Sequence, residues 1–402
     1  MQLTNRQLFY QHLAIPAAVP DALEIVKSEG IYLYDNNGNR FTDLVSGVSV
    51  SNVGHRHPRV LKAIQKQLDQ YLHLMVYGKY IQSPQVKLAA KLTEQLPESL
   101  DSVYFVNSGS EAIEGALKLA KRMTGRTEII AFKDAYHGST HGALSVLGNE
   151  EMKNAYRPLL PDIRFLNFNN QAELEQITER TACVVIEPVQ AEAGIIIPDK
   201  SYLKALRNQC SKTSTVLIFD EVQMGFGRTG KMFAFENFNI TPDILCLAKG
   251  MGGGMPIGAF VSSSSNMNLL THNPALGHIT TFGGHPVSCA AALASLEVIL
   301  EEGLHLNSSE KGKLFVELLK NHPAVKTIRQ IGLMLAVKLK PVHSVAKLVK
   351  ILQGNKLIVD QFLFNSSSFR IAPPLTITEQ EIREVSEKVV ECLDGLTNKI
   401  QT

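Results

Sequence analysis

Asp220 and Lys249 are the two residues of this sequence whose positions first suggest chemistry. Each ends a short apolar run, VLIFD at 216–220 and ILCLAK at 244–249, and four glycines follow within 250–254. Glycines leave space beside the lysine, and an amine desolvated in such a place has a lowered pKa and attacks carbonyl carbons. A buried ion pair between the two residues is the simpler alternative. The tract from Gly250 to Leu296 contains no Asp, Glu, Lys or Arg, which favours an uncharged interior around a ligand.

A third feature is a turn that leads from an apolar strand into a helix, VYFVNSGSEAIEG at 103–115. Ser108 and Glu111 have the spacing of a capping box, which marks the first turn of a helix. The backbone N–H groups of Gly109 and Ser110 would then point out of the helix N-terminus, where an anion such as phosphate is favoured. A plain helix start is the alternative. The turn has neither a Walker lysine nor G-x-G-x-x-G, which disfavours nucleotides and dinucleotides.

These residues need elements that bring them together, and the sequence predicts a sheet that can do so. Short apolar runs alternate with helical patterns through the middle of the chain, at 103–106, 128–132, 183–188, 216–221 and 244–248. Such alternation is typical of a mainly parallel sheet covered by helices on both faces, with ligands at the carboxyl ends of the strands. The polar residues after Val106, together with Glu187, Asp220 and Lys249, stand at such ends. We therefore expect them to line one crevice.

The remaining segments predict a smaller α+β unit. The last hundred residues combine helical patterns at 292–302 and 381–396 with shorter strands at 332–339 and 369–373. The segment YLYDNNGNRFTDL, at 32–44, has the pattern of a hairpin around an Asn-Gly turn and is expected to belong with this unit. The predicted division is an N-terminal segment 1–45, a large domain 46–297 and a small α+β domain 298–402.

Composition narrows the classes of function. The chain has 402 residues, 40 Lys plus Arg against 38 Asp plus Glu, and 45% hydrophobic residues. These are the values of a globular protein without the basic surface of a nucleic-acid binder, so a small-molecule partner is predicted, with no nucleic acid and no membrane. The five cysteines form no C-x-x-C pair and no leader or anchor is visible, so we expect a cytoplasmic location. His55 and His57 lack a nearby third ligand, so no metal is expected.

Phosphate at a helix N-terminus, a lysine that forms a Schiff base and a carboxylate for a pyridinium nitrogen are the three anchors that pyridoxal phosphate requires. The run from Asp220 to Ala259 resembles the signature of class III aminotransferases, the family of acetylornithine, ornithine and 4-aminobutyrate aminotransferases. Further resemblances follow in the family's order: VSGVSVSNVGHRHP at 45–58, NSGSEA at 107–112, AYHG at 135–138, IEPVQAEAG at 186–194, TTFGGHPVSCAAALA at 280–294 and RIAPPLTIT at 370–378. The resemblance implies pyridoxal-phosphate fold type I, with a mainly parallel seven-stranded sheet in the large domain.

The resemblance also implies a role for each matched position around the cofactor. Lys249 would form the Schiff base and shuttle a proton, Asp220 would pair with the pyridine nitrogen, and Gln223 would hydrogen-bond the phenolate side of the ring. The other implied contacts are ring stacking by Tyr136, phosphate binding by Gly109 and Ser110, support of the ring pocket by Glu187, and a phosphate contact from Thr281 of the neighbouring subunit. A homodimer with shared active sites follows from the last of these. Core or surface positions are the plainer alternatives for Tyr136 and its neighbours.

On the substrate side, the resemblance implies that Arg370 anchors a carboxylate and that Glu192 pairs with it or releases it. The arginine that usually follows the HG pair and binds a second carboxylate is replaced by Ser139, and Arg56 and His141 are the sequence candidates for a substitute. The expected reaction takes an amino group from an ω-amino donor, of the acetylornithine, ornithine or 4-aminobutyrate type, to 2-oxoglutarate by a ping-pong mechanism. Pyruvate is the alternative acceptor. A decarboxylase or aminomutase of the same fold, or a non-catalytic binding protein, are alternatives from other classes.

Overall fold

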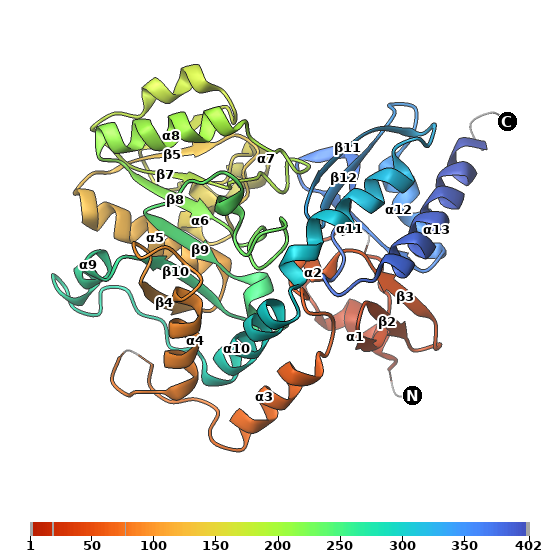
Figure 1. Ribbon diagram of the computed structural model, residues 1–402, viewed down its shortest axis with the longest axis horizontal. Helices are drawn as coiled ribbons and strands as arrows, with labels where there is room; N and C mark the ends of the chain where they lie inside the picture. Colours follow the sequence, from red (N-terminus) through yellow and green to blue (C-terminus); the bar gives the residue numbers. More distant parts are fainter. Residues whose placement is uncertain (1–2, 18–19, 77, 399–402) are drawn as a thin grey trace.

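A computed structural model describes residues 3–17, 20–76 and 78–398 of the chain, and Figure 1 shows it as two parts lying side by side. The larger part contains a seven-stranded sheet, and the smaller part contains two four-stranded sheets. The first and the last residues that the structure describes both lie in the smaller part. None of the helices in the described residues is long and apolar enough to span a membrane.

The large sheet has the strand order β4-β10-β9-β8-β7-β5-β6. Its strands are β4 (Ser102–Val106), β5 (Glu128–Phe132), β6 (Ile163–Leu166), β7 (Thr181–Ile186), β8 (Val216–Asp220), β9 (Ile244–Leu247) and β10 (Gly258–Ser262). β10 is antiparallel to both β4 and β9, and the other neighbouring pairs are parallel. The prediction of a mainly parallel α/β sheet of fold type I is confirmed. Sequence analysis missed β6 and β10.

Both faces of the sheet are buried at its inner strands β5, β7, β8 and β9, which explains why these strands are nearly continuous apolar runs. In β7, Val184 and Ile186 belong to one hydrophobic core, while Cys183 and Val185 belong to a second core on the opposite face. The helix α5 (Gly109–Thr124) covers the second face. Its backbone approaches β10 so closely that a Cβ atom at Gly115 would lie 2.2 Å from the ring of Phe260.

Helices from several parts of the chain complete the larger part. They are α3 (Pro58–Leu68), α4 (Ser83–Thr93), α6 (His141–Ser145), α7 (Glu150–Lys153), α8 (Lys200–Thr213), α9 (Ser264–Met267) and α10 (Pro286–Glu301). The helix predicted at 292 begins earlier, at Pro286. Proline is well placed at a first helical position, and the ring of His285 accepts a hydrogen bond from the N–H of Val287 at 3.3 Å.

The smaller part joins segments from both ends of the sequence. One sheet consists of β1 (Ile25–Glu29), β2 (Tyr32–Asp35), β3 (Arg40–Asp43) and β13 (Leu357–Ile358), and β2 and β3 form the expected hairpin. The other consists of β11 (Val325–Ile331), β12 (Met334–Leu339), β15 (Asn365–Ile371) and β14 (Asp360–Phe362), in that order. The helices are α1 (Asn5–His12), α2 (Ser46–Ser49), α11 (Leu304–Leu319), α12 (Val345–Gly354) and α13 (Glu379–Asn398). The exact domain boundaries stay a prediction.

Candidate active site

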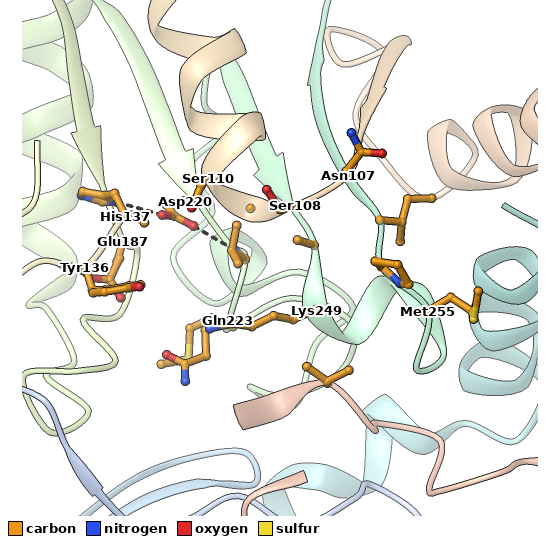
Figure 2. Close-up of a pocket in the computed structure, with 18 of the residues that line it drawn as sticks. Asn107, Ser108, Ser110, Tyr136, His137, Glu187, Asp220, Gln223, Lys249 and Met255 are labelled. Atoms are coloured by element: carbon orange, nitrogen blue, oxygen red, sulfur yellow. Dashed lines mark hydrogen bonds and ion pairs between the residues drawn. The ribbon is translucent and has the colours of Figure 1, made fainter. Parts of the chain in front are cut away.

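A cavity of about 450 Å³ opens at the carboxyl ends of the parallel strands of the large sheet. Residues that follow or end β4, β5, β7, β8 and β9 all contribute to its wall, and Ile257, which precedes the antiparallel β10, completes it. Parallel strands bring their carboxyl ends to one edge of a sheet, so residues far apart in sequence meet there. Of the predicted site residues, seven line this cavity: Gly109, Ser110, Tyr136, Glu187, Asp220, Gln223 and Lys249. Figure 2 shows how most of these side chains surround the same space.

The N-terminus of α5 forms one wall. Ser108 caps the helix, because its hydroxyl accepts a hydrogen bond from the N–H of Glu111 at 3.2 Å. The Glu111 carboxylate accepts from the N–H of Asn107 at 2.8 Å rather than from Ser108, so the predicted capping box is only half formed. A helix leaves the N–H groups of its first turn without helical partners, which is what an anion needs.

Two glycines bring backbone close to this wall. A Cβ at Gly109 would lie 2.7 Å from a methyl group of Val222, and a Cβ at Gly138 would lie 2.1 Å from the Ser110 hydroxyl. Gly138 also has a φ of +130°, which disfavours any residue with a side chain. The backbone at Gly109 and Gly138 therefore packs directly against Val222 and Ser110, where a larger residue would clash.

Asp220 is held in a buried hydrogen-bond pair. Its Oδ2 lies 2.8 Å from Nδ1 of His137, and its Oδ1 accepts from the N–H of Val222 at 3.0 Å. Both side chains are almost completely removed from solvent, and Figure 2 shows them meeting at the cavity wall. Sequence analysis did not select His137 as a site residue. Its place beside Tyr136 in AYHG was the only signal.

Glu187 supports the loop that carries Tyr136. Its two carboxylate oxygens accept from the N–H groups of Tyr136 at 3.0 Å and of Ala191 at 2.9 Å. Burial raises the pKa of Glu187 to about 7, and Asp220 adds to the rise while His137 opposes it. Glu187 therefore fixes two loops around the cavity.

Lys249 follows β9 with a φ of +46°, a left-handed angle that side chains rarely adopt. Burial lowers the pKa of its ammonium group; Glu192 opposes this shift and Arg370 reinforces it. A lowered pKa leaves more of the amine in the unprotonated, nucleophilic form at neutral pH.

Arg370 and Glu192 form an ion pair behind the cavity rather than in its wall. The Nη2 atom of Arg370 lies 2.8 and 2.7 Å from the two carboxylate oxygens of Glu192, and Gln223, which lines the cavity, donates to Glu192 at 3.4 Å. Arg370 is only 1% exposed, and its Nε and Nη1 are buried without a partner in the described residues. The structure thus has a buried cation with free N–H groups next to the site.

Several predicted residues lie elsewhere. Thr281 is exposed and is not part of the wall of its own chain's cavity. Arg56 and His141 are also exposed and outside the wall, so neither supplies the missing second cation there. Ser139 is exposed and does not line the cavity, but its hydroxyl lies 3.3 Å from that of Tyr136, which does. His55 bonds the carboxylate of Asp43 at 2.8 Å.

These groups fit pyridoxal phosphate. The first turn of α5 offers backbone N–H groups for a phosphate, Asp220 offers a carboxylate, and Lys249 offers an amine with a lowered pKa. Gly109 and Gly138 let Val222 and Ser110 pack closely beside the first turn of α5. Each of the three anchors comes from a different segment of the chain and faces the same space.

Comparisons with known proteins agree with this chemistry. The family described as aminotransferase class-III matches residues 15–393. The acetylornithine aminotransferase of Methanocaldococcus jannaschii is 40% identical over 97% of this chain and 96% of that protein. A [LysW]-aminoadipate semialdehyde/glutamate semialdehyde transaminase of Sulfurisphaera tokodaii is 36% identical over 94% and 96%. The solved ornithine aminotransferase of Toxoplasma gondii superposes with a TM-score of 0.91 at 27% identity, over 98% of this chain and 94% of that one.

Proposed function

The chain belongs to the class III aminotransferases, which makes it an enzyme with pyridoxal phosphate as cofactor, and on this premise we propose that it transfers the amino group of an ω-amino donor to 2-oxoglutarate by a ping-pong mechanism. The donor is of the acetylornithine, ornithine or 4-aminobutyrate type. The observation that carries the proposal is the buried Arg370–Glu192 pair beside the cavity of Lys249. The pair gives the site one cation, Arg370, which can bind a substrate carboxylate when Glu192 moves away from it.

When bound, pyridoxal phosphate supplies an aldehyde that condenses with amines and a ring that draws electrons from the reacting carbon. The first turn of α5 would hold its phosphate, and Asp220, oriented by His137, would hold the protonated ring nitrogen. Lys249 would bond the aldehyde and then, as a free amine, take a proton from the substrate carbon and return it. Tyr136 and Gln223 would fix the ring from the sides.

The Arg370–Glu192 pair suits two substrates that differ in whether the reacting carbon carries a carboxylate. An ω-amino donor has no carboxylate there, so Glu192 can stay on Arg370 and neutralise it. A 2-oxo acid has one, and Arg370 can bind it once Glu192 moves away. An unpaired buried charge costs several kcal/mol, so in each half of the reaction Arg370 needs one of the two carboxylates.

Pyruvate is a second candidate acceptor, and Ser139 is the observation that favours it. No Lys or Arg other than Lys249 lines the cavity in the described part of the chain, so a second acceptor carboxylate has no cation there. The test of both candidates is to measure kcat/KM for 2-oxoglutarate and pyruvate with a panel of ω-amino donors. Absence of transfer from any ω-amino donor, with transfer from α-amino acids alone, would reject the proposed donor class.

Ser139→Arg is expected to restore the missing cation. The variant should gain in kcat/KM for 2-oxoglutarate relative to pyruvate by about 1.5 to 3 kcal/mol, the value of a charge-assisted hydrogen bond. Ser139→Gln is the control, because it adds a comparable length without charge and should change the ratio little. If the wild type already prefers 2-oxoglutarate a hundredfold and the arginine adds nothing, a second cation reaches the site from elsewhere.

The proposal includes a homodimer with shared sites, or a dimer of dimers. An apolar surface around Thr281 supports it: Leu276, Ile279 and Phe282 are 54%, 48% and 54% exposed. We expect light scattering to give at least twice the chain mass, and Phe282→Asp to weaken the dimer by about 2 kcal/mol and to lower cofactor affinity with it. A fully active monomer would contradict this. A cytoplasmic location, consistent with the five free cysteines, is also part of the proposal.

A further inference from the structure

Two arginines of the smaller part lie in one row across a sheet. Arg329 on β11 is directly opposite Ala336 on β12, and Ala336 is directly opposite Arg370 on β15. Directly opposite residues of antiparallel strands project from the same face, so both guanidinium groups point to the same side. Ala336, between them, is the smallest side chain of β12. The row therefore places two cations on one side of the sheet, with the small side chain of Ala336 between them.

The loop that carries Glu192 lies against this sheet. Gln190 and Ile196 pair through their backbones and close the loop at its base. The carbonyl of Glu192 accepts from the N–H of Phe364 at 3.1 Å, and the carbonyl of Ala193 accepts from the Asn365 side chain at 3.1 Å. The carbonyl of the third residue, Gly194, accepts from Nε of Arg329 at 2.7 Å.

Arg329 makes the shortest of these three contacts, and its guanidinium packs tightly against Gly194. Gly194 has a φ of +93°, and a Cβ there would lie 2.7 Å from Nη2 of Arg329. That Nη2 is buried and has no hydrogen-bond partner in the described residues, and burial lowers the pKa of the guanidinium. The Arg329 side chain is half-buried, so part of its guanidinium is taken out of water for a contact with one backbone carbonyl, which carries a cost.

We propose that Arg329 is a positioning residue that holds the loop of Glu192 against the sheet, and thereby sets how readily Arg370 is released to a substrate carboxylate. The inference rests on the proposed function, in which Arg370 exchanges Glu192 for the carboxylate of the acceptor. Arg329 touches neither substrate nor cofactor. It acts by keeping the Glu192 carboxylate within reach of Arg370.

This role predicts that a carboxylate ligand responds to the change and an amine ligand does not. The apparent affinity for a carboxylate is scaled by the fraction of molecules in which Arg370 is free, so a looser Glu192 strengthens carboxylate binding. An amine without a carboxylate makes no contact with Arg370, so a looser Glu192 should leave amine binding unchanged. A loss of fold stability alone would move both affinities in one direction or leave both unchanged.

The experiment uses cofactor-loaded protein and two probes. Valerate, an unreactive monocarboxylate, is titrated by calorimetry, and n-butylamine is titrated by the change in cofactor absorption. Arg329→Gln should tighten valerate about three- to tenfold and leave butylamine unchanged. Glu192→Gln should do the same, and adding Arg329→Gln to it should have no further effect, because the two changes act through one carboxylate.

Three comparisons decide the outcome. Arg329→Lys keeps the charge and one donor for the Gly194 carbonyl, so its valerate affinity should fall between those of the wild type and Arg329→Gln. If Arg329→Gln does not fold, the comparison of Arg329→Lys with the wild type is the test. Lys326→Gln removes an exposed charge from the same strand and should change neither affinity. Unchanged valerate affinity in both Arg329 variants, or a full effect that persists beside Glu192→Gln, overturns the proposal. Because binding is measured without turnover, failure of the proposed reaction would show separately, as absent amino transfer in the wild type.

Discussion

Replacement of Lys249 by alanine is expected to lower the rate of amino transfer by about 10²- to 10⁴-fold, the contribution of a positioned general acid and base. The loss should lie at the upper end, because the same amine also provides the covalent attachment of the cofactor. Burial already lowers the pKa of this amine, and no other lysine lines the cavity in the part of the chain that the structure describes. Single-turnover kinetics with an amino donor would measure the loss.

The spectrum of the purified protein gives a second measure of the same residue. The wild type should be yellow, and the absorption band of the lysine-bound cofactor should be lost in Lys249→Ala. Lys231→Ala is the matched control: Lys231 is exposed, lies in the loop after β8, and should affect neither band nor rate. Added methylamine should partly restore turnover in Lys249→Ala, since it supplies a base to the vacated space. A colourless wild type that takes up no cofactor would overturn the assignment of the site.

Replacement of Asp220 should be the second most damaging change. Without a carboxylate opposite the ring nitrogen, the buried positive charge on that nitrogen is unpaired, at a cost of about 3 to 5 kcal/mol. This corresponds to roughly two to four powers of ten in rate. Asp220→Ala should therefore retain the cofactor on Lys249 and lose most of its turnover, which absorption and steady-state rates on the same sample would show.

Asp220→Asn separates charge from hydrogen bonding. The asparagine has the shape of the aspartate and can still accept a hydrogen bond from His137, which lies 2.8 Å from the carboxylate in the structure. If the negative charge is what matters, both variants should lose activity alike. Near-native turnover in Asp220→Asn would mean that the hydrogen bond to His137, and not the charge, is what the reaction requires.

Much of the fold was predictable because the large sheet is buried on both faces. Strands β5, β7, β8 and β9 are buried at every position and β4 is half-buried, so all five appear in the sequence as mainly apolar runs. β10 was missed because its pattern merges with the uncharged tract around it. Its antiparallel direction depends on where the chain returns, which no local pattern encodes.

The sequence by itself determined which residues stand at the strand ends and what cofactor they suit. Asp220 and Lys249 each terminate an apolar run, and the turn at Ser108 starts a helix by its own capping hydrogen bond, so local chemistry is enough to place them. Parallel pairing then brings them to a common edge. The cofactor followed from three residue types whose positions are set by the ends of regular elements.

Only the tertiary structure decided how these residues are held and how substrate access is controlled. His137 meets Asp220 across 83 residues of sequence, and Arg370 meets Glu192 across 178. Arg329 reaches the loop of Glu192 from another sheet, across 135 residues. Contacts of this kind depend on which faces pack together after the sheets have formed, and hydrophobic periodicity reports burial but not the partner across the interface.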